Sequence, residues 1–390
     1  MPISLKNEAA IAGIGLTEFS KNSGVSELSL ASQCIKAACD DAGLLPSEID
    51  GLVSYTLDST DEIEVARAVG AGDLTLFSKI NYGGGAAVGT IAQAAMAIAT
   101  GQANNVVCYR AMNGRSGQRM GQGVSGNIIS SDIIHWSWYM AYGMLNPGSW
   151  VAMIANKYMH KYGVTREDLG RVAISQRNYA QENLRASGYG KPLAMEEYLA
   201  SPMLAYPLCL YDFCQETDGG CAILVTSSER AKELKHRPAV IRAVTQASTQ
   251  GQEQMTSFYR DGLDSLPEME LAARRVYQIA ELGPDDIDAA CLYDAFASEV
   301  VMQLESFGFC KRGEAKELIR DGALDIDGRL PNNTHGGLLS EGYIHGMNNI
   351  AEGVRLIRGE STGQPQKSVE HVLVSSGVGV PTGALILGRD

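Results

Sequence analysis

Residues 332–349, NNTHGGLLSEGYIHGMNN, combine groups that can move protons with glycines that let backbone approach another surface closely. Tyr343 stands at the mouth of this loop, just before a helix-patterned run, IAEGVRLI. His335 and His345 flank it, although a single histidine is more often a structural hydrogen-bond partner. A phenol and two imidazoles are side chains that act in general acid–base catalysis. The stretch is therefore a candidate proton-transfer site.

The cysteines do not indicate a metal centre. Cys209, Cys214 and Cys221 come nearest to a cluster, but they lack the two-residue spacing of a zinc knuckle, so we expect no bound metal. The remaining thiols are scattered, which is typical of buried cysteines in a reducing compartment. The eight are Cys34, Cys39, Cys108, Cys209, Cys214, Cys221, Cys291 and Cys310.

Composition and charge exclude several classes of function. The 390 residues carry a net charge of −13, which gives no electrostatic footprint for nucleic acid or for an anionic membrane surface. The N-terminus lacks a cationic-then-apolar signal pattern, and no run of about 18 apolar residues occurs. We therefore expect a cytoplasmic protein without membrane insertion. The 43 glycines are dispersed, which indicates many tight turns rather than disorder.

The chain repeats one plan twice. Residues 26–55 read as an amphipathic helix that ends at Gly43, then a turn, PSEID, and a short strand, GLVSY. Residues 271–296 repeat this order with the turn GPDDID and the strand AACLY. A second pair of segments, 83–109 and 341–360, each begins with a glycine turn and continues as a helix.

The repeat predicts an α/β fold with two halves. Alternating strands and helices favour mostly parallel sheets covered by helices, and each half also opens with a strand pattern. We place the N-terminal half at 1–230 and the C-terminal half at 235–390, with a loop or lid insertion at 110–205 that holds all three tryptophans. An aromatic cluster of this kind is more often core or a subunit interface than a substrate wall.

The whole chain resembles the thiolase superfamily, in its sterol-carrier-protein or lipid-transfer branch. The matching pieces occur in order in both halves: AAIAGIG, DAGL with PSEIDG, IATGQANNVVC, ETDGGCAILVTS, YDAF and GGLLSEGY. This resemblance implies the thiolase fold, in which two duplicated α/β halves pack as a five-layer αβαβα structure.

The catalytic residues of thiolases are replaced at the matching positions. The resemblance places their cysteine nucleophile at the start of the first-half helix, where this sequence has Gly84 and no cysteine within twenty residues. Their G-H-P histidine becomes Tyr343, and the histidine of their HDxF-like motif becomes Tyr293. Their C-terminal cysteine maps to 374–383, which contains none. Acyl-enzyme chemistry therefore lacks its thiolate.

Two phenols without a nucleophile suit retro-aldol cleavage of a β-hydroxyacyl-CoA. This reaction needs a base for the hydroxyl group, an oxyanion hole for the thioester enolate, and an acid for the α carbon. Tyr293 and Tyr343 are the candidate base and acid, without an assignment of which is which. Asp294 would point to the opposite face of the strand. Candidate oxyanion or substrate-loop residues are Gly84, Gly85, Gly337 and His345.

The sequence is similar to the thiolase-like aldolases of bacterial steroid side-chain degradation, and this resemblance implies a substrate and a partner. The expected substrate is a 17-hydroxy steroid side-chain CoA thioester, which would give a 17-ketosteroid and a short acyl-CoA such as propionyl-CoA. The resemblance also implies a homodimer core joined by a small OB-fold partner domain in a heterotetramer. No cofactor is expected apart from the CoA of the substrate.

Two alternatives remain open. The chain could be an inactive acyl-CoA or lipid-binding scaffold within a complex, as the glycine at position 84 would allow. It could also transfer acyl groups with another nucleophile, for which Ser375, Ser376 and Cys291 are the candidates. Cys291 lies in the AACLY strand and is more easily understood as core packing.

Overall fold

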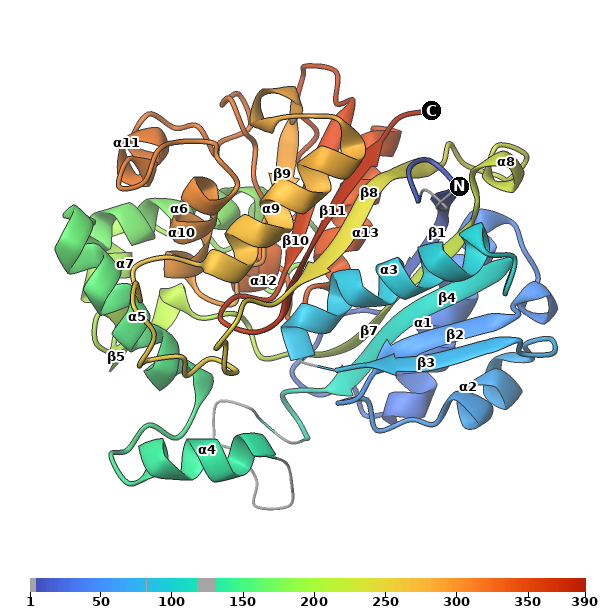
Figure 1. Ribbon diagram of the computed structural model, residues 1–390, viewed down its shortest axis with the longest axis horizontal. Coiled ribbons are helices and arrows are strands. Elements are labelled where there is room, and N and C mark those ends of the chain that lie inside the picture. Colours follow the sequence, from blue (N-terminus) through green and yellow to red (C-terminus); the bar gives the residue numbers. More distant parts are fainter. Residues whose placement is uncertain (1–4, 82, 118, 120–130) are drawn as a thin grey trace.

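The computed structural model describes residues 5–81, 83–117, 119 and 131–390, and residues 131–135 only as helical backbone. Nine strands hydrogen-bond into one sheet, in the order β3-β2-β4-β7-β1-β8-β11-β10-β9 (Figure 1). The strands are β1 Ala9–Leu16, β2 Gly51–Tyr55, β3 Leu76–Ile80, β4 Asn105–Asn113, β7 Asp218–Ser227, β8 Ala239–Ala247, β9 Ala289–Cys291, β10 His371–Ser376 and β11 Thr382–Gly388, and a separate hairpin pairs β5 Met203–Ala205 with β6 Leu208–Cys209.

The strand order shows the duplication. From the centre outward, the first half runs β1-β7-β4-β2 and the second runs β8-β11-β10-β9, so each half has the same order, and β3 extends only the first. The halves meet where β1 pairs with β8 through Ala10 with Val240 and Ile11 with Ala239. The predicted two-part α/β fold is therefore confirmed, whereas the proposed boundary near residue 230 stays a prediction.

The expectation of mostly parallel sheets was wrong. Only β2–β3, β2–β4 and β9–β10 are parallel, and the other neighbours in the sheet are antiparallel. The physical reason is visible at β10 and β11, which are joined by the short loop 377–381. A link this short reverses the chain, because a parallel crossover needs a dozen residues or more.

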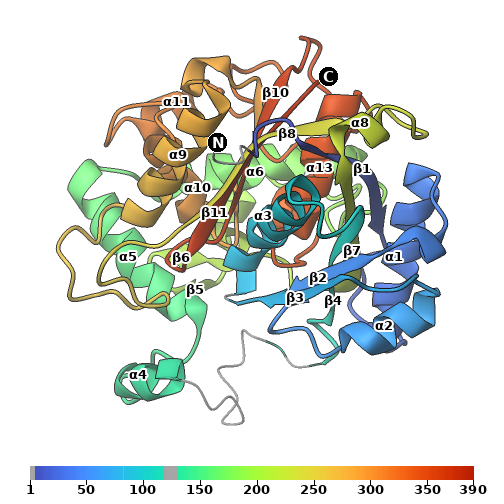
Figure 2. The same cartoon turned by 45° about the vertical axis from the view of Figure 1, so that its right-hand side comes forward.

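The two halves of the sheet act as two separate β layers. Helices cover their outer faces and lie between them, which gives five layers, as predicted. α3 and α13 touch each other, and both contact strands of the two halves, so they form the middle layer (Figure 2). α1 covers the outer face of the first half and α9 that of the second. The helices are α1 Glu27–Ala42, α2 Glu62–Val69, α3 Ala86–Ala99, α4 Ser131–Met140, α5 Pro147–Tyr162, α6 Arg166–Glu182, α7 Met195–Ala200, α8 Ser228–Ala231, α9 Pro267–Ala280, α10 Ala297–Ser306, α11 Ala315–Arg320, α12 Gly337–Ser340 and α13 Met347–Arg358.

Local signals in the sequence explain the element ends. Ser26 caps α1 by accepting a hydrogen bond from the backbone of Ser29, and Gly43 ends it in the left-handed conformation at φ 76°. The repeated turns form short 3₁₀ helices, Pro46–Glu48 and Pro284–Asp286. The predicted strand GLVSY is β2, and AACLY contains β9.

The region 110–205 holds α4, α5, α6 and α7, and its residues 118 and 120–130 lie outside the described part. α4 lies at the foot of Figure 1, and the indole N–H of its Trp136 donates to the carbonyl of Gln254 at 3.3 Å. Trp136 and Trp150 are buried with ring centroids 4.9 Å apart, as expected of a core cluster, but Trp138 is 72% exposed. Within the described residues, no helix combines the length and the apolar character needed to cross a bilayer.

Candidate active site

The two predicted tyrosines meet although they come from different elements. The hydroxyl oxygens of Tyr293 and Tyr343 lie 3.0 Å apart, which is a hydrogen bond. Tyr293 follows β9, and its backbone N–H donates to the Ser375 hydroxyl at 2.8 Å while its carbonyl accepts from the Gln303 amide at 2.6 Å. The backbone N–H of Tyr343 donates to the Thr217 hydroxyl at 2.9 Å. Both phenols are thus held by backbone anchors, and their free ends point at each other.

Gly84 makes room for this pair. It precedes α3, where the resemblance places a thiolase nucleophile, and a Cβ built on it would overlap the hydroxyl oxygen of Tyr293 and lie 2.8 Å from Cε2 of the ring. Cβ atoms do not approach other heavy atoms this closely. The phenol therefore occupies the space that a side chain at position 84 would need, and a cysteine there is incompatible with Tyr293 as it lies.

Burial keeps both phenols protonated. Desolvation raises the pKa of Tyr293 well above its usual value of about 10, and the neighbouring Tyr343 raises it further. Desolvation is also the main cause of the raised pKa of Tyr343, followed by the nearby Cys214. Neither side chain is a ready phenolate at neutral pH, so any proton that one phenol accepts must be matched by one that the pair gives away.

His345 lies beside Tyr343, with ring centroids 4.9 Å apart. Its side chain is buried, its backbone has the unusual φ of 49°, and its Nδ1 accepts a hydrogen bond of 3.3 Å from Nε of Arg110. Burial lowers the pKa of His345 well below its usual value, and the Arg110 charge lowers it further. The imidazole is therefore neutral.

A cavity of about 620 Å³ opens onto Tyr293, Tyr343, His345 and Gly84. This volume is within the usual range of small-molecule sites. Phe213 and Phe296 form one apolar wall, with their rings edge to face at 5.1 Å. Three leucines that also line the cavity are partly open to solvent: Leu57 is 42%, Leu204 53% and Leu210 46% exposed. Three cationic residues share the same lining, namely Lys21, Arg115 and Arg119.

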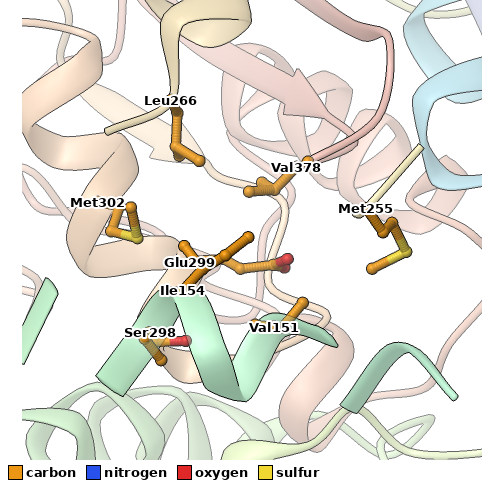
Figure 3. Close-up of a pocket in the computed structure, with 10 residues that line it drawn as sticks. Val151, Ile154, Met255, Leu266, Ser298, Glu299, Met302 and Val378 are labelled. Carbon is orange, nitrogen blue, oxygen red and sulfur yellow. The ribbon is translucent and has the colours of Figure 1, made fainter. Parts of the chain in front are cut away.

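Glu299 is a buried carboxyl group in the first turn of α10 that was not among the predicted site residues. It lines the large cavity and also a small cavity of about 10 Å³, room for about one water molecule, which is otherwise mostly apolar. Figure 3 shows its carboxyl group among Val151, Ile154 and Val378. Desolvation raises its pKa well above the usual value, which favours the neutral acid. The only signal in the sequence was an acidic residue within the apolar run ASEVV.

Some predicted residues lie elsewhere. Gly85 and Gly337 are not among the residues that line the cavity: a Cβ would meet the Pro381 carbonyl oxygen at Gly85 and the Asp294 carboxylate at Gly337. These glycines serve close packing. Asp294 accepts a hydrogen bond from the backbone of Leu339 at 3.1 Å and does not line the cavity, in agreement with the predicted opposite face.

The alternative nucleophiles are not placed for acyl transfer. Ser375, Ser376 and Cys291 are fully buried and absent from the cavity lining. Ser375 instead bridges Tyr293 and Gln303. Cys214 does line the cavity, but burial raises the pKa of its thiol, followed by the effect of the Asp294 charge, which disfavours a thiolate.

Fold and site together define a thiolase-like protein whose nucleophile position is filled by a phenol. Comparison with known families agrees: the thiolase N-terminal domain matches residues 9–229, and the thiolase C-terminal domain-like family matches residues 249–389. The chain belongs to the thiolase family.

Within this family, the chain is similar to two lyases over almost its full length. It is 54% identical over 388 residues to the steroid side-chain-cleaving aldolase of Thermomonospora curvata, covering 99% of each chain. It is 52% identical over 387 residues to the 17-hydroxy-3-oxo-4-pregnene-20-carboxyl-CoA lyase of Mycobacterium tuberculosis, covering 98% of this chain and 100% of the relative.

Solved structures give the same grouping. The structure described as Ltp2-ChsH2(DUF35) aldolase matches with a TM-score of 0.95 at 53% identity and covers 99% of each chain. An acetyl-CoA acetyltransferase from Syntrophomonas wolfei matches with a TM-score of 0.70 at 16% identity, which shows the common fold alone.

Proposed function

We propose that this protein is an aldolase that cleaves a carbon–carbon bond of a β-hydroxyacyl-CoA by retro-aldol chemistry. The observation that carries this proposal is the hydrogen-bonded pair of Tyr293 and Tyr343 in the space that Gly84 leaves open. The two relatives described above are named as an aldolase and a lyase. The reaction needs proton transfer and oxyanion stabilisation but no covalent intermediate.

The paired phenols can carry the one proton that the reaction moves. When the bond between the β and α carbons breaks, the electrons of that bond form the enolate and the β oxygen becomes a carbonyl oxygen. The proton of the β-hydroxyl group must then reach the α carbon. One phenol accepts the hydroxyl proton while passing its own to the second, and the second protonates the α carbon. Neither has to exist as a free phenolate, which agrees with the raised pKa values of both.

The substrate is a steroid with a 17-hydroxyl group and a side-chain CoA thioester, and the products are a 17-ketosteroid and a short acyl-CoA such as propionyl-CoA. The Mycobacterium tuberculosis relative is named for a 17-hydroxy-3-oxo-4-pregnene-20-carboxyl-CoA substrate. The cavity supports a bulky apolar substrate, because Phe213 and Phe296 form a wall and leucines remain open to solvent around it.

CoA is part of the substrate, and the proposed reaction needs no further cofactor, since bond cleavage and proton transfer balance between substrate and protein. Lys21, Arg115 and Arg119 supply positive charge to the cavity of an otherwise acidic protein. Arg119 is already paired with Glu216. Lys21 and Arg115 are the better candidates for contacts with the CoA phosphates, whose recognition by cations is favourable.

The assembly proposed for the chain is a thiolase-type homodimer joined by small OB-fold partner domains in a heterotetramer. The description of the similar solved structure names a second component beside Ltp2, which supports a complex. A cytoplasmic location belongs to the same proposal and rests on the sequence pattern. The alternative is a binding scaffold without activity. The hydrogen-bonded pair of phenols argues against this alternative, because packing alone does not require two hydroxyl groups at the cavity.

The decisive experiment is an assay of the purified chain, with and without an OB-fold partner, on a 17-hydroxy-steroid-20-carboxyl-CoA. Mass spectrometry would follow the ketone and the short acyl-CoA. Release of both products, lost in Tyr343→Phe, supports the aldolase. No release in the assembled complex while the CoA ester still binds would support the scaffold, and a stable acyl adduct on Cys214 would support acyl transfer.

A further inference from the structure

A chain of three buried side chains ends at His345. The Asp58 carboxylate accepts a hydrogen bond from Nη1 of Arg110 at 3.1 Å, and Nε of Arg110 donates to Nδ1 of His345 at 3.3 Å. Asp58 is itself fixed, because it accepts from the hydroxyl of Thr60 at 2.6 Å and from the backbone N–H of Ala111 at 3.2 Å. The resulting Asp58–Arg110–His345 chain links β4 to the loop before α13.

This chain sets the tautomer of the imidazole. An arginine side chain has only N–H donors and keeps its charge, so Nδ1 of His345 must be the unprotonated nitrogen. The single ring proton then resides on Nε2. A second proton would place an imidazolium against the guanidinium of Arg110 in a buried site. The aromatic rings beside it in the described part of the chain are the phenols of Tyr55 and Tyr343. The low pKa of His345 agrees with this assignment.

The protonated nitrogen of His345 is buried and left without a protein partner in the described part of the chain. Nε2 of His345 has no hydrogen-bond partner among the described residues, although the side chain is buried and lines the cavity. Gly83 lies against this nitrogen, since a Cβ at that position would be in van der Waals contact with it at 3.6 Å. An unpaired buried donor costs free energy, so a built site normally supplies it with a partner. Because His345 also lines the large cavity, the partner that fits is an atom of a ligand bound there.

We propose that Nε2–H of His345 donates a hydrogen bond to the thioester oxygen of the substrate, and that Asp58 and Arg110 are positioning residues that hold this tautomer. The inference rests on the proposed aldolase function. As the carbon–carbon bond breaks, negative charge grows on that oxygen, and a preorganised donor stabilises it. His345 keeps its proton throughout, so the proton balance of the tyrosine pair is unchanged.

The tautomer can be measured in the wild-type chain, with one variant used only to assign the signals. In the full-length chain labelled with [15N]histidine, NMR would show one unprotonated and one protonated nitrogen for His345, and His345→Gln would assign the signals. The expected result is a proton on Nε2 only. A proton on Nδ1, or on both nitrogens at neutral pH, would overturn the proposal. Arg110→Lys keeps the charge beside Asp58 but removes the Nε donor, and we expect it to mix the two tautomers.

Kinetics with the assembled enzyme test the role of the donor. His345→Ala is expected to lower kcat about 100-fold with little change in KM, since losing one oxyanion donor typically costs 10²- to 10³-fold. His345→Gln retains an N–H and should recover part of the loss. His335→Gln is the matched control, because His335 is buried in the same loop but does not line the cavity.

The outcomes separate this inference from the proposed function. If the wild-type enzyme cleaves the substrate and His345→Ala cleaves it equally fast, only the donor role fails. If the wild-type enzyme does not cleave any such substrate, the aldolase proposal and the donor role fail together. Thermal unfolding of each variant distinguishes a lost donor from a lost fold.

Discussion

Tyr293 fills the place that a side chain on Gly84 would occupy. A Cβ at position 84 would overlap the Tyr293 hydroxyl oxygen, so the two positions are sterically coupled although they belong to different halves of the chain. A thiolate at the start of α3 and a phenol at Tyr293 exclude each other. The thiolase fold therefore has room either for a nucleophile side chain at position 84 or for the phenol of Tyr293, but not for both.

This coupling predicts the result of a mutant cycle. Gly84→Ala should destabilise the protein by about 1–3 kcal/mol, as overpacking of a core typically does, and should abolish cleavage by displacing the phenol. In a Tyr293→Ala background the same substitution should cost almost nothing. Chemical denaturation of the four proteins measures the coupling. Equal penalties in both backgrounds would show that the two residues do not compete for space.

The proposed proton path from one tyrosine to the other predicts that the two phenols act as one unit. Tyr293→Phe and Tyr343→Phe should each reduce kcat by about 10²- to 10⁴-fold, the usual range for a lost proton-transfer group. The double variant should be little worse than either single variant, because one break already interrupts the path. Steady-state kinetics of the three variants test this. Multiplied losses in the double variant would mean that each tyrosine has an independent role.

The raised pKa values of both tyrosines predict a flat pH profile. Groups with a raised pKa remain protonated until the pH passes that value, which lies above the usual 10 for each phenol. The low pKa of His345 keeps the imidazole neutral over the same range. We expect kcat to vary little from about pH 7 to about pH 9. A tenfold rise per pH unit would instead indicate a phenolate base.

Glu299 predicts a pH dependence of stability. Burial raises the pKa of its carboxyl group in the folded protein. The unfolded group has a pKa of about 4.3, so the favourable contribution is complete below that value and is lost as the pH rises through the folded pKa. Glu299→Gln, which has no such ionisation, should gain stability relative to the wild type as the pH rises. Thermal unfolding at several pH values measures this difference, and parallel curves would contradict it.

Much of the fold could be predicted from local patterns. Helical periodicity with Ser26 and Gly43 at its ends defined α1, and the repeated PSEID and GPDDID turns revealed the duplication. Strand direction was not predictable in this way, because hydrophobic patterns do not record orientation. Only the short loop 377–381, between two strand patterns, carried a signal for the antiparallel pair β10–β11.

The site was predictable where it coincides with family motifs and not where it depends on distant contacts. Tyr293 and Tyr343 occupy motif positions, so comparison of residue types identified them. Gly337 belongs to the same motif, yet its lack of a side chain serves packing against Asp294. Arg110 lies in a strand with no motif of its own, and its contact with His345 exists only because β4 runs beneath the loop before α13.

The middle layer makes the two halves of the chain depend on each other. α3 and α13 each cover strands of both halves and lie against one another, so their apolar surfaces are closed only when both copies are present. A single repeat unit would leave its middle helix facing water. Either half on its own would therefore need a second apolar surface, from another copy or another chain, to cover its middle helix.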